Sequence, residues 1–246
     1  MLKLIVHGAA GHMGCVLRDL ISQHANQYTL AYAADAKSDS PEFAPLSEFS
    51  GAADCIIDFS NHAATKDLVD FALTHKMPLV VATTGQTDAE LELLHQGAKE
   101  IPIFLAANMS LGIATLIKVV KQATALFPDA DIEIVEQHHN RKLDVPSGTA
   151  LALGKAIQSV RPGAKLVIGR HDYGQREQHE IGIHSLRLGD VVGIHEVIIT
   201  NGAETLTLRH EAHSRSVFAL GALHAAEFLV QQEPGCYQMN DLLKGL

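Results

Sequence analysis

Residues 3–14 read KLIVHGAAGHMG, and this stretch decides the fold. Residues 3–7 are mostly apolar and β-branched, which predicts a short buried strand. From Met13 to His24 the apolar residues follow helical spacing. Glycines at 8, 11 and 14 would allow a tight turn, close approach of a pyrophosphate to the backbone, and close packing of helix on strand. The helix start also offers free N–H groups to phosphates. The stretch therefore predicts a dinucleotide-binding turn.

A single acidic residue strengthens this interpretation. The glycine spacing is GxxGxxG, whereas the common fingerprint is GxGxxG, so the motif alone is a weak match. Asp35, however, follows a second expected strand at 29–34 and lies 21 residues after Gly14 (14 to 35). An acidic residue about 20 positions on is the expected partner of the adenosine ribose hydroxyls. The alternatives are a glycine-rich turn that binds nothing and a solvated loop aspartate.

The rest of the first half alternates strand-like and helix-like segments. Ser60 is expected to cap a helix that runs to about His75, and Thr87 with Glu90 has the spacing of a capping box. Further strands are expected at 54–59, 78–82 and 101–106. This alternation predicts an α/β domain with a Rossmann-like, doubly wound parallel sheet that helices cover on both faces.

After Asn108 the pattern changes. Helices are expected at 111–127, from the Pro-Ser-Gly-Thr of 146–149 to about 161, and at 216–231. Strands are expected at 131–137, 181–187, 191–200 and 206–210. Asn201-Gly202 lies between the last two and is a strong hairpin signal. Successive strands joined by turns predict a second, α+β domain with an open mixed or antiparallel sheet.

The segment from Glu136 to Ala150, EQHHNRKLDVPSGTA, carries the candidate chemistry. Four potentially cationic side chains lie within residues 138–142, directly after an expected strand, at the edge where α/β sheets bind ligands. Gly148 and Thr149 open a helix and would offer backbone amides to an anion. Because histidine donates protons near neutral pH, the segment predicts a carboxylate-binding pocket with proton donors. Two surface histidines, a metal site and a solvated basic face are the alternatives.

Composition narrows the class of protein. The chain has 246 residues, 47% of them hydrophobic, and a formal net charge of −9. This favours a globular protein and disfavours binding to nucleic acid, which requires Lys and Arg. No apolar stretch reaches the roughly 18 residues of a membrane span. Cys15, Cys55 and Cys236 are scattered, so we expect no disulfide, no metal site and a cytoplasmic location.

Residues 136–150 match, at each fixed position, the signature E-x-H-H-x-x-K-x-D-x-P-S-G-T-A of the dihydrodipicolinate reductases of lysine and diaminopimelate biosynthesis. The chain also resembles this family at 8–14, 83–85, 106–110, 180–187 and 189–193. The resemblance implies reduction of 4-hydroxy-tetrahydrodipicolinate to tetrahydrodipicolinate with NADH or NADPH. It also implies a homotetramer joined through the sheets of the second domain. The implied domains are 1–109 with 217–246, and 110–216.

The resemblance assigns roles to individual residues. His138 matches the acid/base residue and Lys142 the second proton donor, whereas His139, Gly148 and Thr149 match contacts to the cyclic dicarboxylate. The implied nucleotide contacts are Gly8, Ala9, Ala10, Gly11, His12, Met13, Asp35, Ala82, Thr83, Thr84, Ala106, Ala107, Asn108 and Met109.

Departures from the family pattern bear on the choice of cofactor. His12 stands where the family often has Arg or Lys, Ala36 where some members have Arg, and Ala82 where Gly is common. Asp35 would repel the 2′-phosphate of NADPH, although Lys37 could reach a phosphate. We expect NADH to be preferred or both to be used. The rival functions are another Rossmann-type dehydrogenase, acting on a semialdehyde or on homoserine, and a non-catalytic NADH-binding sensor.

Overall fold

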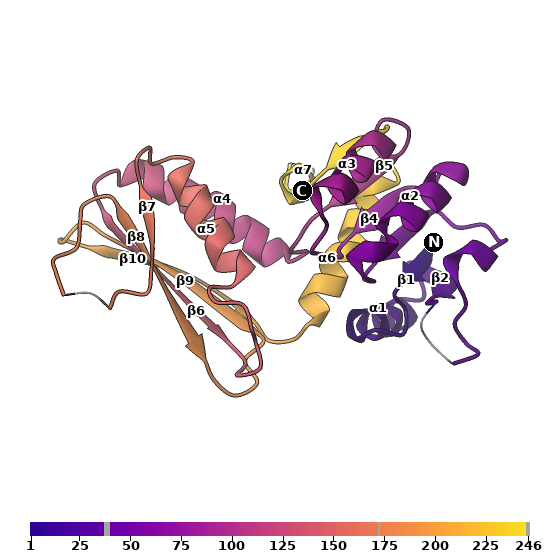
Figure 1. Ribbon diagram of the computed structural model, residues 1–246, viewed down its shortest axis with the longest axis horizontal. Helices are drawn as coiled ribbons and strands as arrows, with labels where there is room; N and C mark the ends of the chain where they lie inside the picture. The colour runs from indigo at the N-terminus through magenta and orange to yellow at the C-terminus, as the bar shows by residue number, and fades with distance from the viewer. Residues whose placement is uncertain (37–39, 172, 245–246) are drawn as a thin grey trace. The chain divides into compact units, whose positions relative to one another are not determined.

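The chain folds into two compact units. The computed structural model describes residues 1–36, 40–171 and 173–244 (Figure 1). The first unit comprises Met1–Leu111 and Arg215–Leu246, and the second comprises Gly112–Ser214. These bounds lie within two residues of the expected domains. Lys37, which the sequence suggested as a phosphate contact, lies outside the described residues.

A parallel sheet forms the centre of the first unit. Its order is β11-β5-β4-β3-β1-β2. The strands are β1 (Leu2–His7), β2 (Tyr28–Ala34), β3 (Cys55–Asp58), β4 (Leu79–Val81), β5 (Pro102–Leu105) and β11 (Gly235–Tyr237). Residues of β1 and β3 to β5 are buried on both faces, which is typical of parallel sheets covered on both sides. The predicted Rossmann-like sheet is confirmed, but β11 was not predicted because three residues carry no periodicity.

Helices cover both faces of this sheet. They are α1 (His12–Gln23), α2 (Thr65–Thr74), α3 (Asp88–Gly97), α6 (Ser216–Leu229) and the short α7 (Met239–Leu242), with 3-10 turns η1 (Leu46–Glu48) and η2 (His62–Ala64). Leu68 of α2 and Leu94 of α3 pack into one core with Ile56 of β3. On the other face, Phe228 of α6 meets Phe104 of β5 edge-on. The capping box of Thr87 and Glu90 is present at the start of α3.

One local prediction is wrong. Ser60 does not cap a helix, because η2 and then α2 begin only after Asn61, whose side chain accepts from the amide of Ala63. The Ser60 hydroxyl instead donates to Asp58 Oδ1 at 2.5 Å. Asp58 is 2% exposed, and a buried carboxylate requires hydrogen-bond donors. The need to satisfy this carboxylate accounts for the role of Ser60.

The second unit is built on a mixed sheet with the order β10-β9-β6-β8-β7. The strands are β6 (Asp131–His138), β7 (Lys165–Ile168), β8 (Glu180–Arg187), β9 (Gly193–Thr200) and β10 (Thr205–Ala212). Strands β6, β7 and β8 run parallel, and β9 pairs antiparallel with β6 and β10. The hairpin predicted at Asn201-Gly202 joins β9 to β10, with Gly202 at φ 87°. Strand β7 has only four residues and was not predicted.

Two helices of this unit, α4 (Leu111–Leu126) and α5 (Gly148–Gln158), lie along one face of the mixed sheet (Figure 1). Val120 of α4 and Leu153 of α5 pack against Ile134 and Val197 of the strands. Alternation along each strand therefore places one set of side chains under the helices and the other on the opposite face. Glu136 and His138 share the helix-covered face with Ile134, so this packing positions the candidate catalytic side chains.

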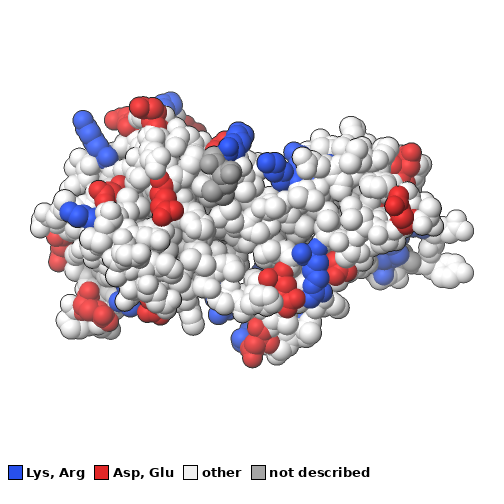
Figure 2. Space-filling view, turned by 180° about the vertical axis from the view of Figure 1, so that it is seen from behind, with Lys and Arg blue, Asp and Glu red and all other residues white. Residues whose placement is uncertain are grey.

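On the surface shown in Figure 2, Lys and Arg are interspersed with Asp and Glu, and most of the surface carries neither. Positive charge on this face is therefore not gathered into one patch. Within the described ranges, no helix combines the length and the apolarity that crossing a bilayer requires.

Candidate active site

The first candidate region is a pocket of about 420 Å³ in the first unit. It lies where the strand order changes direction, because β1 is flanked by β2 on one side and β3 on the other. Ligands of open α/β sheets bind at this point, outside the carboxyl ends of the strands. Its lining residues are His7, Gly8, Gly11, Asp35, Ala36, Phe59, Ser60, Asn61, Ala63, Ala64 and Asp67.

The glycine turn at this pocket depends on the lack of side chains. Gly8 has φ 79°, and a Cβ there would lie 2.5 Å from the carbonyl oxygen of Phe59. A Cβ on Gly14 would lie 2.2 Å from the carbonyl oxygen of Gly8. Gly11 is the N-cap of α1 and has no side chain to occupy the first turn. The first amides of α1 have no acceptor within the helix, and a helix start of this kind can bind an anion.

Asp35 is held across the glycine turn. Its Oδ2 accepts from the amide of Ala10 at 3.1 Å, and its own amide donates to the carbonyl of Ala44. The carboxylate thus lies at the end of β2, beside the turn, where an adenosine ribose is expected. Ala36, the next residue, lines the same pocket and supplies no positive charge there.

A cluster that was not predicted from the sequence lies at this pocket around the buried carboxylate of Asp58. His7 Nδ1 lies 2.9 Å from Asp58 Oδ1, and both the amide and the hydroxyl of Ser60 donate to the same oxygen. His7 and Asp58 are register partners on β1 and β3. The cluster therefore fixes the His7 ring at the pocket. The sequence did contain a signal for this cluster, because each of the two apolar strands ends in a polar residue.

The other predicted nucleotide residues lie at the same edge of the sheet but outside this pocket. Residues 82–84 follow β4 and residues 106–109 follow β5, both parallel to β1. Thr83 Oγ1 is buried and has no hydrogen-bond partner within the described part of the chain. A Cβ on Gly221 of α6 would lie 1.7 Å from the carbonyl oxygen of Met109. Gly221 thus allows the segment after β5 to pack closely on α6. Of the rest, Ala9 is buried, and Ala10 and His12 are exposed beside the half-buried Met13.

The second candidate region is a buried ion cluster in the second unit. His138 ends β6, and its Nδ1 lies 2.5 Å from Glu136 Oε2. Arg187, on the adjacent strand β8, bonds both oxygens of Glu136 at 2.8 and 2.9 Å. The Glu136 side chain is fully buried. Burial alone raises the pKa of a carboxyl, but the hydrogen bonds from His138, Arg187 and the Ser147 amide outweigh it and hold the pKa of Glu136 well below its usual range. An ionised Glu136 therefore orients the ring of His138, with Nδ1 as donor and Nε2 facing away.

Ser147 and His195 complete the cluster. Ser147 is the N-cap of α5 and accepts from the amide of Ala150. Its own amide donates to Glu136 Oε1 at 3.1 Å, and its hydroxyl lies 3.1 Å from His195 Nε2. Burial and then the nearby charge of His138 lower the pKa of His195 to about 3. His195 is therefore neutral at physiological pH. The sequence analysis assigned roles to none of Glu136, Arg187, Ser147 and His195.

The remaining predicted substrate residues flank this cluster. Gly148 begins α5 and is exposed, and a Cβ there would meet no atom within 4 Å. Thr149 follows on the first turn of α5. Lys142 Nζ lies 2.8 Å from Asp144 Oδ1, and this hydrogen bond lowers the pKa of Asp144. His139 precedes Lys142 in a turn, in which its carbonyl accepts from the Lys142 amide. Cations, an imidazole donor and a helix N-terminus thus share the carboxyl end of β6.

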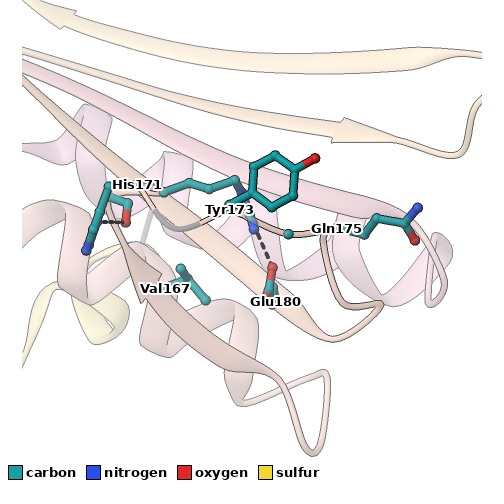
Figure 3. Close-up of a pocket in the computed structure, with 8 residues that line it drawn as sticks. Val167, His171, Tyr173, Gln175 and Glu180 are labelled. Atoms are coloured by element: carbon teal, nitrogen blue, oxygen red, sulfur yellow. Dashed lines mark hydrogen bonds and ion pairs between the residues drawn. The ribbon is translucent and has the colours of Figure 1, made fainter.

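A second pocket, of about 210 Å³, lies after β7 in the second unit (Figure 3). Arg170 is its cation, and it bonds Glu180 Oε2 at 2.6 Å. The hydrogen bond raises the pKa of Arg170 and lowers that of Glu180, so both stay charged and pair with each other. Tyr173 and His171 project at the surface around this pair (Figure 3). The pocket contains no residue with a predicted role.

The structure also shows the surroundings of the cysteines and whether the described residues group as metal ligands. Cys55 is buried, and burial raises the pKa of its thiol, as it does that of Cys236. Both thiols therefore favour the protonated, less nucleophilic form. All three cysteines belong to the first unit. Within residues 1–36, 40–171 and 173–244, no three His, Cys, Asp or Glu side chains are grouped as metal ligands.

The fold and the glycine turn define the class of protein: a Rossmann-like, dinucleotide-binding oxidoreductase. Two family models cover nearly the whole chain. The model of the dihydrodipicolinate reductase N-terminus matches residues 2–109, and that of its C-terminus matches residues 112–243. The chain belongs to the dihydrodipicolinate reductase family, and the resemblance seen in the sequence is confirmed.

Individual relatives also support membership of this family. The chain is similar to the 4-hydroxy-tetrahydrodipicolinate reductase of Caldanaerobacter subterraneus subsp. tengcongensis, with 46% identity over 249 residues that cover 99% of both chains. The enzyme of the same name from Alkaliphilus metalliredigens is 41% identical over 98% of this chain and 99% of that one. In fold, the chain is similar to a solved dipicolinate-bound dihydrodipicolinate reductase from Paenisporosarcina sp., with a TM-score of 0.78, 24% identity and coverage of 98% and 99%.

Proposed function

We propose that this protein reduces 4-hydroxy-tetrahydrodipicolinate to tetrahydrodipicolinate with NADH or NADPH, in lysine and diaminopimelate biosynthesis. The observation that carries the proposal is the His138 imidazole, which Glu136 and Arg187 orient beside the start of α5. A proton donor next to an anion-binding helix start suits the reduction of an unsaturated dicarboxylate. The full-length relatives that carry this activity in their names support it.

The residues of the first unit fit a dinucleotide. The first-turn amides after Gly11 suit a pyrophosphate, and Asp35 suits the adenosine ribose. The buried Thr83 hydroxyl, which has no hydrogen-bond partner among the residues that the structure describes, is a further polar group at the same edge of the sheet. When bound, the nicotinamide supplies hydride to the substrate ring. Residues 82–84 and 106–109 are proposed to hold its nicotinamide end.

The residues of the second unit bind the substrate and supply the proton. The amides of Gly148 and Thr149, with His139, bind a substrate carboxylate. As negative charge develops on the ring, His138 donates a proton from Nε2, and Glu136 stabilises the positive imidazolium before that transfer. Lys142 supplies positive charge and a second proton, and Asp144 orients it. Overall, the substrate gains one hydride from the nicotinamide and one net proton, and it loses one water. The second proton, given to the departing hydroxyl, is balanced by the ring proton that is lost when that hydroxyl leaves, and the nicotinamide is left oxidised.

We infer that NADH is preferred or that both nucleotides are used. Asp35 is held at the ribose position, and Ala36 contributes no cation to the pocket. A carboxylate there disfavours a 2′-phosphate through like-charge repulsion. The measurement is kcat/KM for NADH and for NADPH. An advantage of tenfold or more for NADPH would contradict the inference.

A homotetramer in the cytoplasm completes the proposal. The sheet face opposite α4 and α5 carries Val135, Ile194 and Ile198 among charged residues (Figure 1), a composition suited to burial against another sheet. The three free cysteines suit a reducing compartment. Analytical ultracentrifugation at micromolar concentration should give four chains per particle. A monomer would refute the assembly without affecting the reaction.

The direct test of the reaction is NADH oxidation with freshly prepared cyclic substrate. The proposal predicts turnover with this substrate and none with aspartate semialdehyde or homoserine. None of the three cysteines lies in the candidate substrate segment, residues 136–150, which disfavours semialdehyde chemistry, because that chemistry requires a nucleophilic thiol beside the substrate. Binding of NADH without turnover of any of the three substrates would instead support a nucleotide sensor.

A further inference from the structure

Strand β9 contributes two alternate residues to the face that carries His138. His195 is the register partner of Glu136, and Gly193 precedes it by two residues. Both therefore point to the helix-covered face. Gly193 does not have a positive φ, so its backbone conformation does not require glycine. A glycine within a strand usually lowers stability, and it often marks a close approach of other atoms.

The atoms nearest to Gly193 show which groups come close to its backbone. A Cβ built there would lie 3.1 Å from His138 Nε2, 3.5 Å from His138 Cδ2 and 3.8 Å from His195 Cε1. Among the described residues, these two imidazoles supply the three nearest atoms. Because Glu136 holds His138 at Nδ1 on the opposite side of the ring, an added methyl group would press directly on Nε2. The His138 ring would be displaced, and the space for a ligand at Nε2 would be lost.

His195 supports the same ring and the same helix start. The two imidazoles meet edge-on, with centroids 5.1 Å apart and planes at 73°. His195 is 4% exposed. Its Nε2 lies 3.1 Å from the Ser147 hydroxyl, while Ser147 also donates its amide to Glu136. A single side chain thus contacts the His138 ring and holds the first residue before α5.

We propose that Gly193 and His195 are positioning residues for the reduction: Gly193 keeps the space at His138 Nε2 open, and His195 fixes the ring relative to the start of α5. Neither residue touches the reacting atoms in this account. The inference rests on the proposed role of His138. It adds that strand β9 sets the position and the free space of the His138 proton donor. Gly193 on this strand lies 55 residues after His138 in the sequence (138 to 193).

The central test is Gly193→Ala in two backgrounds. In the otherwise native chain we expect kcat to fall about tenfold or more, since small misplacements of a catalytic group have large effects. The Kd for NADH should not change. In the His138→Gln background, Gly193→Ala should cause no further loss beyond about twofold, because residues that act through one another are not additive. Gly174→Ala is the matched control, since a Cβ there meets nothing within 4 Å.

The outcomes separate this inference from the proposed function. If His138→Gln turns over like the native chain, the role of His138 is refuted. If His138→Gln is impaired but Gly193→Ala is not, only the inference fails. An equal loss from Gly193→Ala in both backgrounds would show a general structural effect and would also overturn it.

Two substitutions at His195 test the second part of the proposal, that His195 fixes the His138 ring relative to the start of α5. His195→Leu keeps the packing but removes the bond to Ser147, so the KM for the cyclic substrate should rise and kcat should fall. His195→Gln places an amide near the position of Nε2, within reach of the Ser147 hydroxyl, and it should restore part of both. Equal behaviour of the two variants would refute a positioning role for the hydrogen bond. If the Leu variant does not fold, the Gln variant must still show a raised KM with an unchanged Kd for NADH.

Discussion

The glycine turn of the first unit and the histidine cluster of the second are built in opposite ways. The turn works through backbone amides and the absence of side chains, as the contacts at Gly8 and Gly14 show. The cluster works through buried charged side chains, with Glu136 between His138 and Arg187. The turn should therefore be sensitive to added atoms, whereas the cluster should be sensitive to lost charges. A nucleotide shared by many enzymes suits the first design, and a single reaction suits the second.

Glu136→Gln should have the largest effect on stability. The change leaves Arg187 with a neutral partner in a buried position, and breaking a buried ion pair costs about 3–5 kcal/mol of unfolding free energy. The matched control is Asp70→Asn, which breaks the exposed Lys66–Asp70 pair and should cost less than about 1 kcal/mol. Urea denaturation of both variants checks this. Similar losses in the two would contradict a buried, charge-based cluster.

Gly14→Ala should have the next largest effect, and it should act on the other region. Its Cβ would lie 2.2 Å from the Gly8 carbonyl oxygen, so the turn must move. Overpacking of this kind costs about 1–3 kcal/mol. We expect at least about a tenfold weaker Kd for NADH, with an unchanged Kd for dipicolinate, both measured by calorimetry. Unaltered NADH binding would show that the turn does not hold the nucleotide.

Stability should fall in mild acid because of His195. Its pKa is lowered from 6.5 to about 3, so below pH 6.5 the unfolded chain binds a proton that the folded chain does not. The free energy of unfolding should decrease as pH falls from 6.5 toward 3, by up to about 1.4 kcal/mol per pH unit from this group. Denaturation at pH 7, 6 and 5 measures the slope. His195→Asn should flatten it, and an identical slope in that variant would exclude His195 as the cause.

The smallest expected effects come from removing the side chain that caps one helix in each unit. Ser147 caps α5 within the cluster, and Thr87 caps α3 away from either pocket. Replacing either by Ala should cost about 1 kcal/mol of stability. Only Ser147→Ala should also lower kcat, because Ser147 contacts Glu136 and His195. Equal kinetics for the two variants would place the α5 cap outside the site.

The two regions also differed in how far the sequence predicted them. Strand, glycine turn, helix and Asp35 lie within 35 residues, so spacing alone was enough to predict the turn. The pair of Glu136 and Arg187 joins residues 51 apart, and no local pattern reveals that β8 lies beside β6. The family motif contains Glu136 and Ser147 without assigning them a role, and Arg187 and His195 lie far from it in the sequence. Ser60 was misassigned because a buried carboxylate, Asp58, competed for its hydroxyl.

Whether His138 and Lys142 supply the protons can be measured by single-turnover oxidation of bound NADH in the His138→Gln and Lys142→Ala variants, with the Kd for NADH determined on the same samples. We predict that the reduction slows by about 10²–10⁴-fold in each, the usual contribution of a positioned acid, while NADH binds as before. Turnover near that of the native chain in both variants would contradict it.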